Sequence, residues 1–101
     1  MAVEVAYTDE FKAWFDSLEQ DEQDRLYRSV GLLEAMGVKL GFPYTSAIRG
    51  ASFALRELRT QSDGDPLRIF YAFDPARQAV LLIGGDKTAD DRFYERMVPL
   101  A

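Results

Sequence analysis

Apolar residues recur along the first part of the chain at two spacings, and each spacing predicts a different element. In residues 3–7 (VEVAY) apolar and other side chains alternate, which predicts a short edge strand. From Phe11 to Leu18 the apolar residues lie three or four positions apart, as on one stripe of a helix. Thr8 precedes this stripe and is a suitable N-cap, so we expect the first helix to begin directly after it.

A second helix is predicted after the polar segment 19–24 (EQDEQD), which interrupts the apolar stripe. Leu26, Val30 and Leu33 resume the helical spacing and are expected to face the core. Gly37 follows and is a typical residue for ending a helix. The two helices should therefore form an antiparallel hairpin that buries one face.

Three strands are predicted in the second half of the chain, at Phe53–Arg59, Leu67–Phe73 and Ala79–Ile83. The segments between them, 62–66 (SDGDP) and 74–77 (DPAR), are rich in turn-forming residues. Such short connections join antiparallel neighbours, because parallel strands need a longer crossover. The three strands should form an antiparallel meander that ends at Gly84-Gly85.

The C-terminal segment predicts a last, short helix. Thr88 and Asp91 have the spacing of a capping box, and the helix would include Tyr94. Segment 38–50 is expected to be a loop because glycine and proline interrupt it. The predicted fold is thus one α+β domain over residues 1–101, with helices on one face of a small antiparallel sheet.

Composition excludes several kinds of chemistry. The chain has no cysteine and no histidine, so disulfides, thiolate nucleophiles, Cys/His zinc sites and imidazole triads are impossible. Any proton transfer at neutral pH must use lysine, tyrosine or a carboxylate. No apolar run is long enough to span a membrane, and the N-terminus lacks a secretory pattern, so we expect a cytoplasmic protein without membrane partners.

The formal net charge is −5, which by itself disfavours a polyanionic partner. The charges are unevenly distributed, however. Residues 1–50 carry nine acidic and five basic side chains, whereas residues 51–101 carry eight and seven. Several arginines of the second half fall on predicted strands. Net charge therefore describes solubility and leaves the class of partner open.

Strand alternation predicts which face of the sheet carries these arginines. Glu57 and Arg59 share one face of their strand, and Arg68 and Phe70 share one face of the next. We expect these four side chains on an uncovered face, where guanidiniums can bind phosphate and a ring can stack on a base. An Arg–Glu ladder that serves only solubility explains the same pattern. The face assignment takes three apolar residues to face the helices, namely Leu58, Ile69 and Leu82.

A second candidate group is GGDKTADDRFY, residues 84–94. Lys87 lies between a strand end and a predicted helix N-terminus, where anions bind, although the GxxxxGK[ST] spacing of a nucleotide-binding loop is absent. Asp86, Asp90 and Asp91 suggest a magnesium site, but capping explains the last two more simply, and we expect no metal and no cofactor. Tyr94 is either a core aromatic or a polar group at the rim of the sheet.

The order of these motifs is similar to that of a known family. LRELR, LRIFYAF, a DP turn, AVLLIGG, DK and FYERMVPLA together resemble the RelE/ParE superfamily of bacterial toxins, and within it the HigB-like branch. The resemblance covers essentially the whole chain. It implies a RelE-like fold and a type II toxin, monomeric alone and hetero-oligomeric with a helix-turn-helix antitoxin.

The resemblance also implies an activity, because many members cut mRNA in the ribosomal A site without metal. Ribosome and mRNA would then be the further partners. Carried over by position, the implied catalytic residues are Arg59, Arg68, Lys87 and Tyr94. The candidates for substrate binding are Arg56, Phe70, Arg77 and Arg92. Two alternatives stay open, a ParE-type gyrase inhibitor without enzymatic activity and an inactive antitoxin-binding module.

Overall fold

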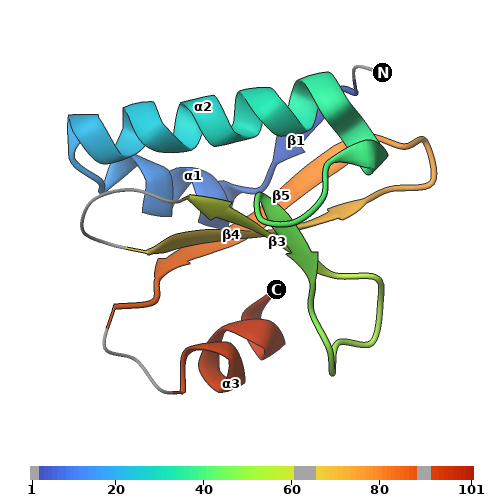
Figure 1. The fold of residues 1–101 in the computed structure, drawn as a ribbon. Coiled ribbons are helices and arrows are strands. Elements are labelled where there is room, and N and C mark those ends of the chain that lie inside the picture. Colours follow the sequence, from blue (N-terminus) through green and yellow to red (C-terminus); the bar gives the residue numbers. More distant parts are fainter. Residues whose placement is uncertain (1–2, 61–65, 89–91) are drawn as a thin grey trace.

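A computed structural model describes residues 3–60, 66–88 and 92–101 and shows one five-stranded sheet with helices on both faces (Figure 1). The sheet order is β1-β5-β4-β3-β2. The strands are β1 (Val5–Tyr7), β2 (Thr45–Ala47), β3 (Arg56–Thr60), β4 (Leu67–Phe73) and β5 (Ala79–Asp86). The helices are α1 (Asp9–Asp16), α2 (Gln20–Met36) and α3 (Phe93–Met97), with short 3-10 turns η1 (Gly37–Lys39) and η2 (Val98–Leu100).

The first two helices confirm the predicted helical spacing, the start of α1 after Thr8 and the end of α2 at Gly37. The Thr8 hydroxyl accepts a hydrogen bond from the Phe11 amide at 3.0 Å, as expected of an N-cap. The segment EQDEQD does not separate the helices as a loop but begins α2, where Glu19 and Glu22 form a capping box. Gly37 ends α2 with a φ of 58°, a conformation that favours glycine.

The sheet is mixed and not purely antiparallel, which corrects one expectation. β1 pairs with β5 in parallel, while β3, β4 and β5 form the predicted antiparallel meander, and β2 pairs antiparallel with β3. A further strand, β2, lies within the predicted loop 38–50. Three residues are too few to show a pattern, and tertiary contacts hold this strand instead. The Thr45 hydroxyl donates to the carbonyl of Glu57 and bonds the hydroxyl of Tyr71.

The helices do not all cover one face of the sheet. α1 and α2 lie on one face, over a core of ten buried residues, and α3 packs on the opposite face. Amphipathic spacing shows that a helix packs on a sheet but not on which face. The last helix also begins at Phe93, later than predicted, and Asp91 of the proposed capping box lies outside the described residues. The second cluster consists of Leu55, Phe70, Phe93 and Met97.

A β-bulge in β5 changes the faces of the sheet. Ile83 pairs with Phe70 but Leu81 pairs with Tyr71, so Leu82 is an extra residue between them. Leu82 consequently packs with the α3 cluster and not with α1 and α2, contrary to the expectation from strict alternation.

Two adjacent glycines at the end of β5 let the two helical layers approach the sheet. Gly84 lies under the ring of Trp14 from α1, so close that a Cβ would collide with it. A Cβ on Gly85 would lie 2.9 Å from the ring of Phe93 in α3. Gly84 therefore faces α1 and Gly85 faces α3, and β5 continues past both glycines to Asp86.

Candidate functional site

Five polar side chains meet on the α3 face of the sheet. This polar cluster consists of Ser46 of β2, Glu57 of β3, Arg68 of β4, Tyr94 of α3, and Lys87, which follows β5. The antiparallel pairing of β3 with β4 brings Glu57 and Arg68 together. A hydrogen bond from the Lys87 amide to the Pro66 carbonyl, 3.0 Å long, holds Lys87 beside the start of β4.

Glu57 and Arg68 form a buried ion pair. Their side chains have exposed fractions of only 8% and 5%, and Nε of Arg68 lies 3.4 Å from Oε1 of Glu57. One terminal nitrogen of Arg68 donates to the Leu67 carbonyl at 3.0 Å, whereas Nε makes no hydrogen bond within the described residues. Buried charges need each other, because removing either partner leaves an uncompensated charge in the interior.

The Glu57 carboxylate accepts hydrogen bonds at both of its oxygens. The Tyr94 hydroxyl donates to Oε1 at 2.7 Å, and the Ser46 hydroxyl donates to Oε2 at 2.9 Å. Nζ of Lys87 donates in turn to the Tyr94 oxygen at 3.3 Å and lies 4.8 Å from the centre of that ring. The result is a chain of hydrogen bonds from Lys87 through Tyr94 to Glu57.

This environment raises the pKa of Tyr94 above its ordinary value. Burial is the main cause, since it disfavours the phenolate, and the hydrogen bond to Glu57 and its negative charge act in the same direction. Arg68 opposes the shift. Tyr94 is therefore a neutral phenol at physiological pH, able to donate its proton to Glu57 and to accept another.

Arg68, Lys87 and Tyr94 are the predicted catalytic residues that the structure brings together; Arg59 lies apart from them. Arg59 is opposite Arg68 in the strand register, but its guanidinium lies over the ring of Phe42, 5.4 Å from the ring centre, at the edge of the sheet.

The expectation of an uncovered sheet face is wrong. Arg68 is buried, and Phe70 is fully buried against Phe93, with their ring centres 5.8 Å apart, so neither projects into solvent. The cause is α3, which covers the face that the sequence analysis took to be open. In this arrangement Phe70 supports the helix that carries Tyr94 and cannot stack on a base.

The remaining candidates for substrate binding lie outside the polar cluster. Arg56 is paired with Tyr71, which belongs to the core under α1 and α2, so it lies on the other face. Arg77 is exposed in the turn that joins β4 to β5, beyond the end of β4 that is distant from Leu67. Arg92 precedes α3 and forms an ion pair with Glu95 at 3.0 Å.

Sequence reasoning missed the part that two residues play in this cluster. Glu57 was considered only as a neutralising neighbour of the arginines, although its place on the face of Arg59 and its presence in an ELR segment were visible. Ser46 lies in a segment predicted to be a loop, and no local pattern distinguishes it. Its position depends on the pairing of β2 with β3, where Ser46 lies opposite Glu57.

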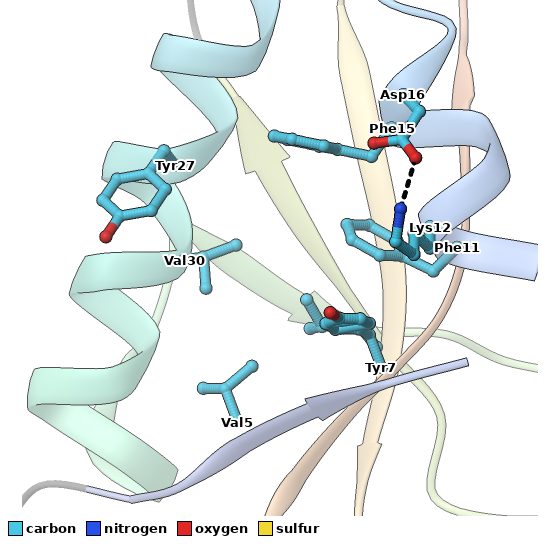
Figure 2. A pocket seen from close by; sticks show the side chains of 9 residues that line it. Val5, Tyr7, Phe11, Lys12, Phe15, Asp16, Tyr27 and Val30 are labelled. Atoms are coloured by element: carbon cyan, nitrogen blue, oxygen red, sulfur yellow. Dashed lines mark hydrogen bonds and ion pairs between the residues drawn. The ribbon is translucent and has the colours of Figure 1, made fainter. Parts of the chain in front are cut away.

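A separate hollow of about 330 Å³ lies on the other side of the molecule, between β1, α1 and α2. Figure 2 shows its lining, which is mainly apolar and aromatic and includes Tyr7, Phe11 and Tyr27. The one ion pair drawn there joins Lys12 to Asp16. This groove lacks the convergent polar groups of the cluster and is no candidate for catalysis.

The described residues offer no arrangement for a resident metal or a membrane span. No group of three potential ligands among aspartate, glutamate, cysteine and histidine comes together in them. Asp90 and Asp91, considered above for magnesium, lie outside the described ranges. No helix in the described part of the chain is long and apolar enough to cross a membrane.

Comparison with known proteins gives consistent matches over most of the chain. A family model described as phage derived protein Gp49-like (DUF891) matches residues 13–101. The putative toxin HigB3 of Mycobacterium tuberculosis is 40% identical over 90 residues, which cover 87% of this chain and 77% of HigB3. The putative toxin HigB2 of the same bacterium is 36% identical over 100 residues, covering 96% of this chain and 50% of HigB2.

Solved structures with the same fold include two RelE toxins. RelE in the archaeal RelE-RelB complex of Pyrococcus horikoshii matches with a TM-score of 0.67 and 15% identity, over 88% of this chain and 99% of that one. A mutant E. coli RelE in the free state matches with a TM-score of 0.68 and 12% identity, over 100% of both chains. At such identities the structural likeness concerns the fold.

Proposed function

The chain belongs to the Gp49-like family and is a RelE/HigB-type toxin of a toxin–antitoxin system, and on this premise we propose that it is an endoribonuclease that cuts mRNA on the ribosome. The observation that carries the proposal is the hydrogen-bonded chain from Lys87 through Tyr94 to Glu57, beside the guanidinium of Arg68. These side chains can move two protons and offset negative charge in a protein without histidine.

The proposed reaction is in-line attack of a ribose 2′-hydroxyl on the adjacent phosphorus. A bond forms between the 2′-oxygen and phosphorus, and the bond from phosphorus to the 5′-oxygen breaks. The products are a 2′,3′-cyclic phosphate and a 5′-hydroxyl. The enzyme must remove one proton, supply another and stabilise the charge that develops on the phosphoryl oxygens.

Tyr94 and Lys87 are the catalytic residues in this proposal, because they are half-buried groups that can transfer protons, whereas Glu57 and Arg68 are buried. Tyr94 accepts the proton of the 2′-hydroxyl while its own proton passes to Glu57 across the 2.7 Å hydrogen bond. The Lys87 ammonium delivers a proton to the departing 5′-oxygen. Glu57 then releases its extra proton to water and Lys87 takes one up, which restores both side chains to their starting protonation states.

Arg68 and Ser46 are positioning residues in the same scheme. Arg68 holds the Glu57 carboxylate in the buried ion pair and would bring its own positive charge close to the reacting phosphate, while Ser46 fixes the second carboxylate oxygen. The ribosome supplies orientation of the substrate, which is worth several orders of magnitude in rate. That contribution explains how a chain with a net charge of −5 acts on RNA.

An antitoxin is the second partner that we propose. The RelE of Pyrococcus horikoshii was solved in complex with RelB. We expect this chain to bind a cognate antitoxin in the same general way, which would keep the toxin inactive until the antitoxin is removed.

The test is mapping of new 5′ ends of mRNA in a translating extract after addition of the purified protein. Tyr94→Phe should lower the rate of cutting by about 10²–10⁴-fold, since it removes the group that relays a proton. Lys87→Met should lower it by about 10²–10³-fold. The matched controls are Tyr27→Phe and Lys39→Met, exposed residues that lie outside the cluster.

Three results would contradict the proposal: no new ends with the wild type, cutting that persists in an extract without ribosomes, or wild-type cutting by Tyr94→Phe and Lys87→Met. If the wild type produces no cuts but inhibits DNA supercoiling by gyrase, the ParE-type alternative replaces the nuclease. If expression of the chain does not slow growth, the inactive antitoxin-binding module replaces both.

A further inference from the structure

The apolar groove between β1, α1 and α2 lies on the face of the sheet opposite the polar cluster (Figure 2). Its volume of about 330 Å³ has room for large apolar side chains of a partner. Tyr7 and Tyr27 belong to the lining, yet 56% and 76% of their surfaces are exposed. Exposed rings at an apolar hollow indicate a surface that binds another molecule.

Gly31 gives independent support for a partner on this side of α2. It lies inside the helix, one turn after Tyr27, where glycine is less favourable than alanine. A Cβ at Gly31 would meet no heavy atom within 4 Å in the described part of the chain, whereas a Cβ at Gly84 would collide with Trp14. Internal packing therefore explains glycine at position 84 but not at position 31. A glycine on a helix surface lets the backbone of a second molecule approach closely.

The part of the chain that builds the groove is strongly acidic. Residues 4–36, which include β1, α1 and α2, carry nine acidic and three basic side chains, whereas the rest of the chain carries eight acidic and nine basic ones. The net negative charge of the chain therefore resides in this segment. An apolar groove in such a surface suits a partner with positive charge around an apolar centre.

Two carboxylates on the groove side of α2 are available to such a partner. Asp24 and Glu34 lie three residues before and seven residues after Tyr27, so they share its side of the helix. Neither forms an ion pair with any residue that the structure describes. The segments outside the described ranges, 1–2, 61–65 and 89–91, contain no basic side chain that could neutralise them.

This charge disfavours two other occupants of the groove. An RNA strand would be repelled, because its phosphates and the carboxylates have the same sign. A second copy of the chain would bring the same acidic segment against itself. A helix with apolar side chains on one face and lysine or arginine beside them fits both the hollow and the charge, in the helix-in-groove mode of recognition.

We propose that this groove binds a basic amphipathic helix of the cognate antitoxin. The inference rests on the proposed function, because it takes the antitoxin proposed above as the partner and adds the contact surface. Apolar side chains of the helix fill the hollow, its backbone passes over Gly31, and its basic side chains reach Asp24 and Glu34. The polar cluster lies on the α3 face of the sheet and makes no contact with this helix.

The test is isothermal titration calorimetry of the purified toxin with the purified protein encoded beside its gene, the expected antitoxin. Gly31→Gln should raise the dissociation constant about ten- to a hundredfold, because the new side chain stands where the helix approaches. The same variant should unfold at a higher urea concentration, since glutamine favours a helix more than glycine does. Tyr7→Ala should weaken binding by a similar factor through loss of an aromatic contact. Glu34→Gln should raise the dissociation constant only about two- to fivefold but reduce its salt dependence.

Matched controls make the same changes outside the groove. Gly41 has as much open space for a new side chain as Gly31, Tyr44 is an exposed ring before β2, and Glu10 is an exposed acid of α1 that does not line the groove. Gly41→Gln, Tyr44→Ala and Glu10→Gln should therefore bind the antitoxin as the wild type does. Circular dichroism checks that each variant is folded.

The inference is overturned if the wild type does not bind this protein, if its binding does not weaken with salt, or if Gly31→Gln and Tyr7→Ala bind as the wild type does. It is also overturned if the toxin alone dimerises and Gly31→Gln abolishes the dimer, which would assign the groove to a second copy of the chain. Cutting of mRNA is measured on the same preparations. Cuts by the wild type together with any of these results leave the nuclease intact. Groove-dependent binding of the antitoxin without such cuts supports the groove and refutes the nuclease.

Discussion

The two faces of the sheet are built in opposite ways. The face under α1 and α2 buries a hydrophobic cluster of ten residues together with the neutral hydroxyls of Tyr71, Thr45 and Thr60. The face under α3 buries four apolar residues and, beside them, the charges of Glu57 and Arg68. Helices of 8 and 17 residues cover the first face, and a helix of 5 residues covers the second.

This difference assigns the stability of the fold mainly to one face of the sheet and the proposed chemistry to the other. Apolar burial stabilises a fold roughly in proportion to its area, so the α1–α2 face provides most of the stability. A buried ion pair contributes little or nothing net, because desolvation of two charges offsets their attraction. We interpret the charged layer under α3 as present for its function and supported by the opposite face.

The largest expected effect is on the buried pair. Arg68→Ala should lower the free energy of unfolding by about 3–5 kcal/mol, since Glu57 would be left as an unpaired buried charge. The double variant Glu57→Leu with Arg68→Met should unfold at nearly the wild-type urea concentration yet cut no mRNA. A double variant as unstable as the single one would show that the pair itself stabilises the fold, and the separation of the two faces would be wrong.

The two adjacent glycines allow a smaller and better matched comparison. Gly84→Ala forces Trp14 away from the sheet on the α1 face, and we expect it to cost about 1–3 kcal/mol of stability. Gly85→Ala displaces Phe93 and with it the helix that carries Tyr94. The first variant should keep its cutting rate per folded molecule, and the second should lose it. Urea unfolding and the mRNA assay, applied to both, decide this, and equal losses of activity would contradict the comparison.

The smallest effect concerns the titration of Tyr94. Its folded pKa is raised above the ordinary value of 10.0, so its contribution to stability is complete below pH 10 and is lost as the pH rises through the folded value. Glu57→Gln removes the carboxylate charge and should lower the pKa of Tyr94. The measurement is the ultraviolet difference spectrum of tyrosinate against Tyr94→Phe, which isolates one of five tyrosines. If the titration midpoint of Tyr94 is unchanged in Glu57→Gln, the proposed role of Glu57 as the proton acceptor is wrong.

Helices α1 and α2 were largely predictable, because caps and apolar spacing within a few residues determine where a helix begins and ends. Thr8 caps α1 and Gly37 ends α2, and both positions follow from a few neighbouring residues. The sheet was predicted less well. The bulge at Leu82 breaks the alternation on which face assignment depends, and β2 is too short to have a period.

The candidate site was only partly predictable, because strand register and not local sequence places some of its residues. Arg68, Lys87 and Tyr94 were named from the sequence and do lie together, but the roles of Glu57 and Ser46 depend on strand register. Arg59 shows the converse case. Its register placed it with Arg68, yet its side chain extends along the sheet edge to Phe42, and a strand pattern cannot predict that direction.

The parallel pairing of β1 with β5 has a consequence for synthesis of the toxin. The Thr8 hydroxyl binds the carbonyl of Leu82, a partner 74 residues later, and β5 lies in the sheet between β1 and β4. Contacts between residues so far apart in the sequence form late, because the chain between them must first be made and must then close a long loop. A nascent chain without β5 lacks the strand that joins β1 to β4, and it also lacks Lys87. We therefore expect toxicity to begin only after β5 has been made, so that an interrupted round of translation releases a harmless fragment.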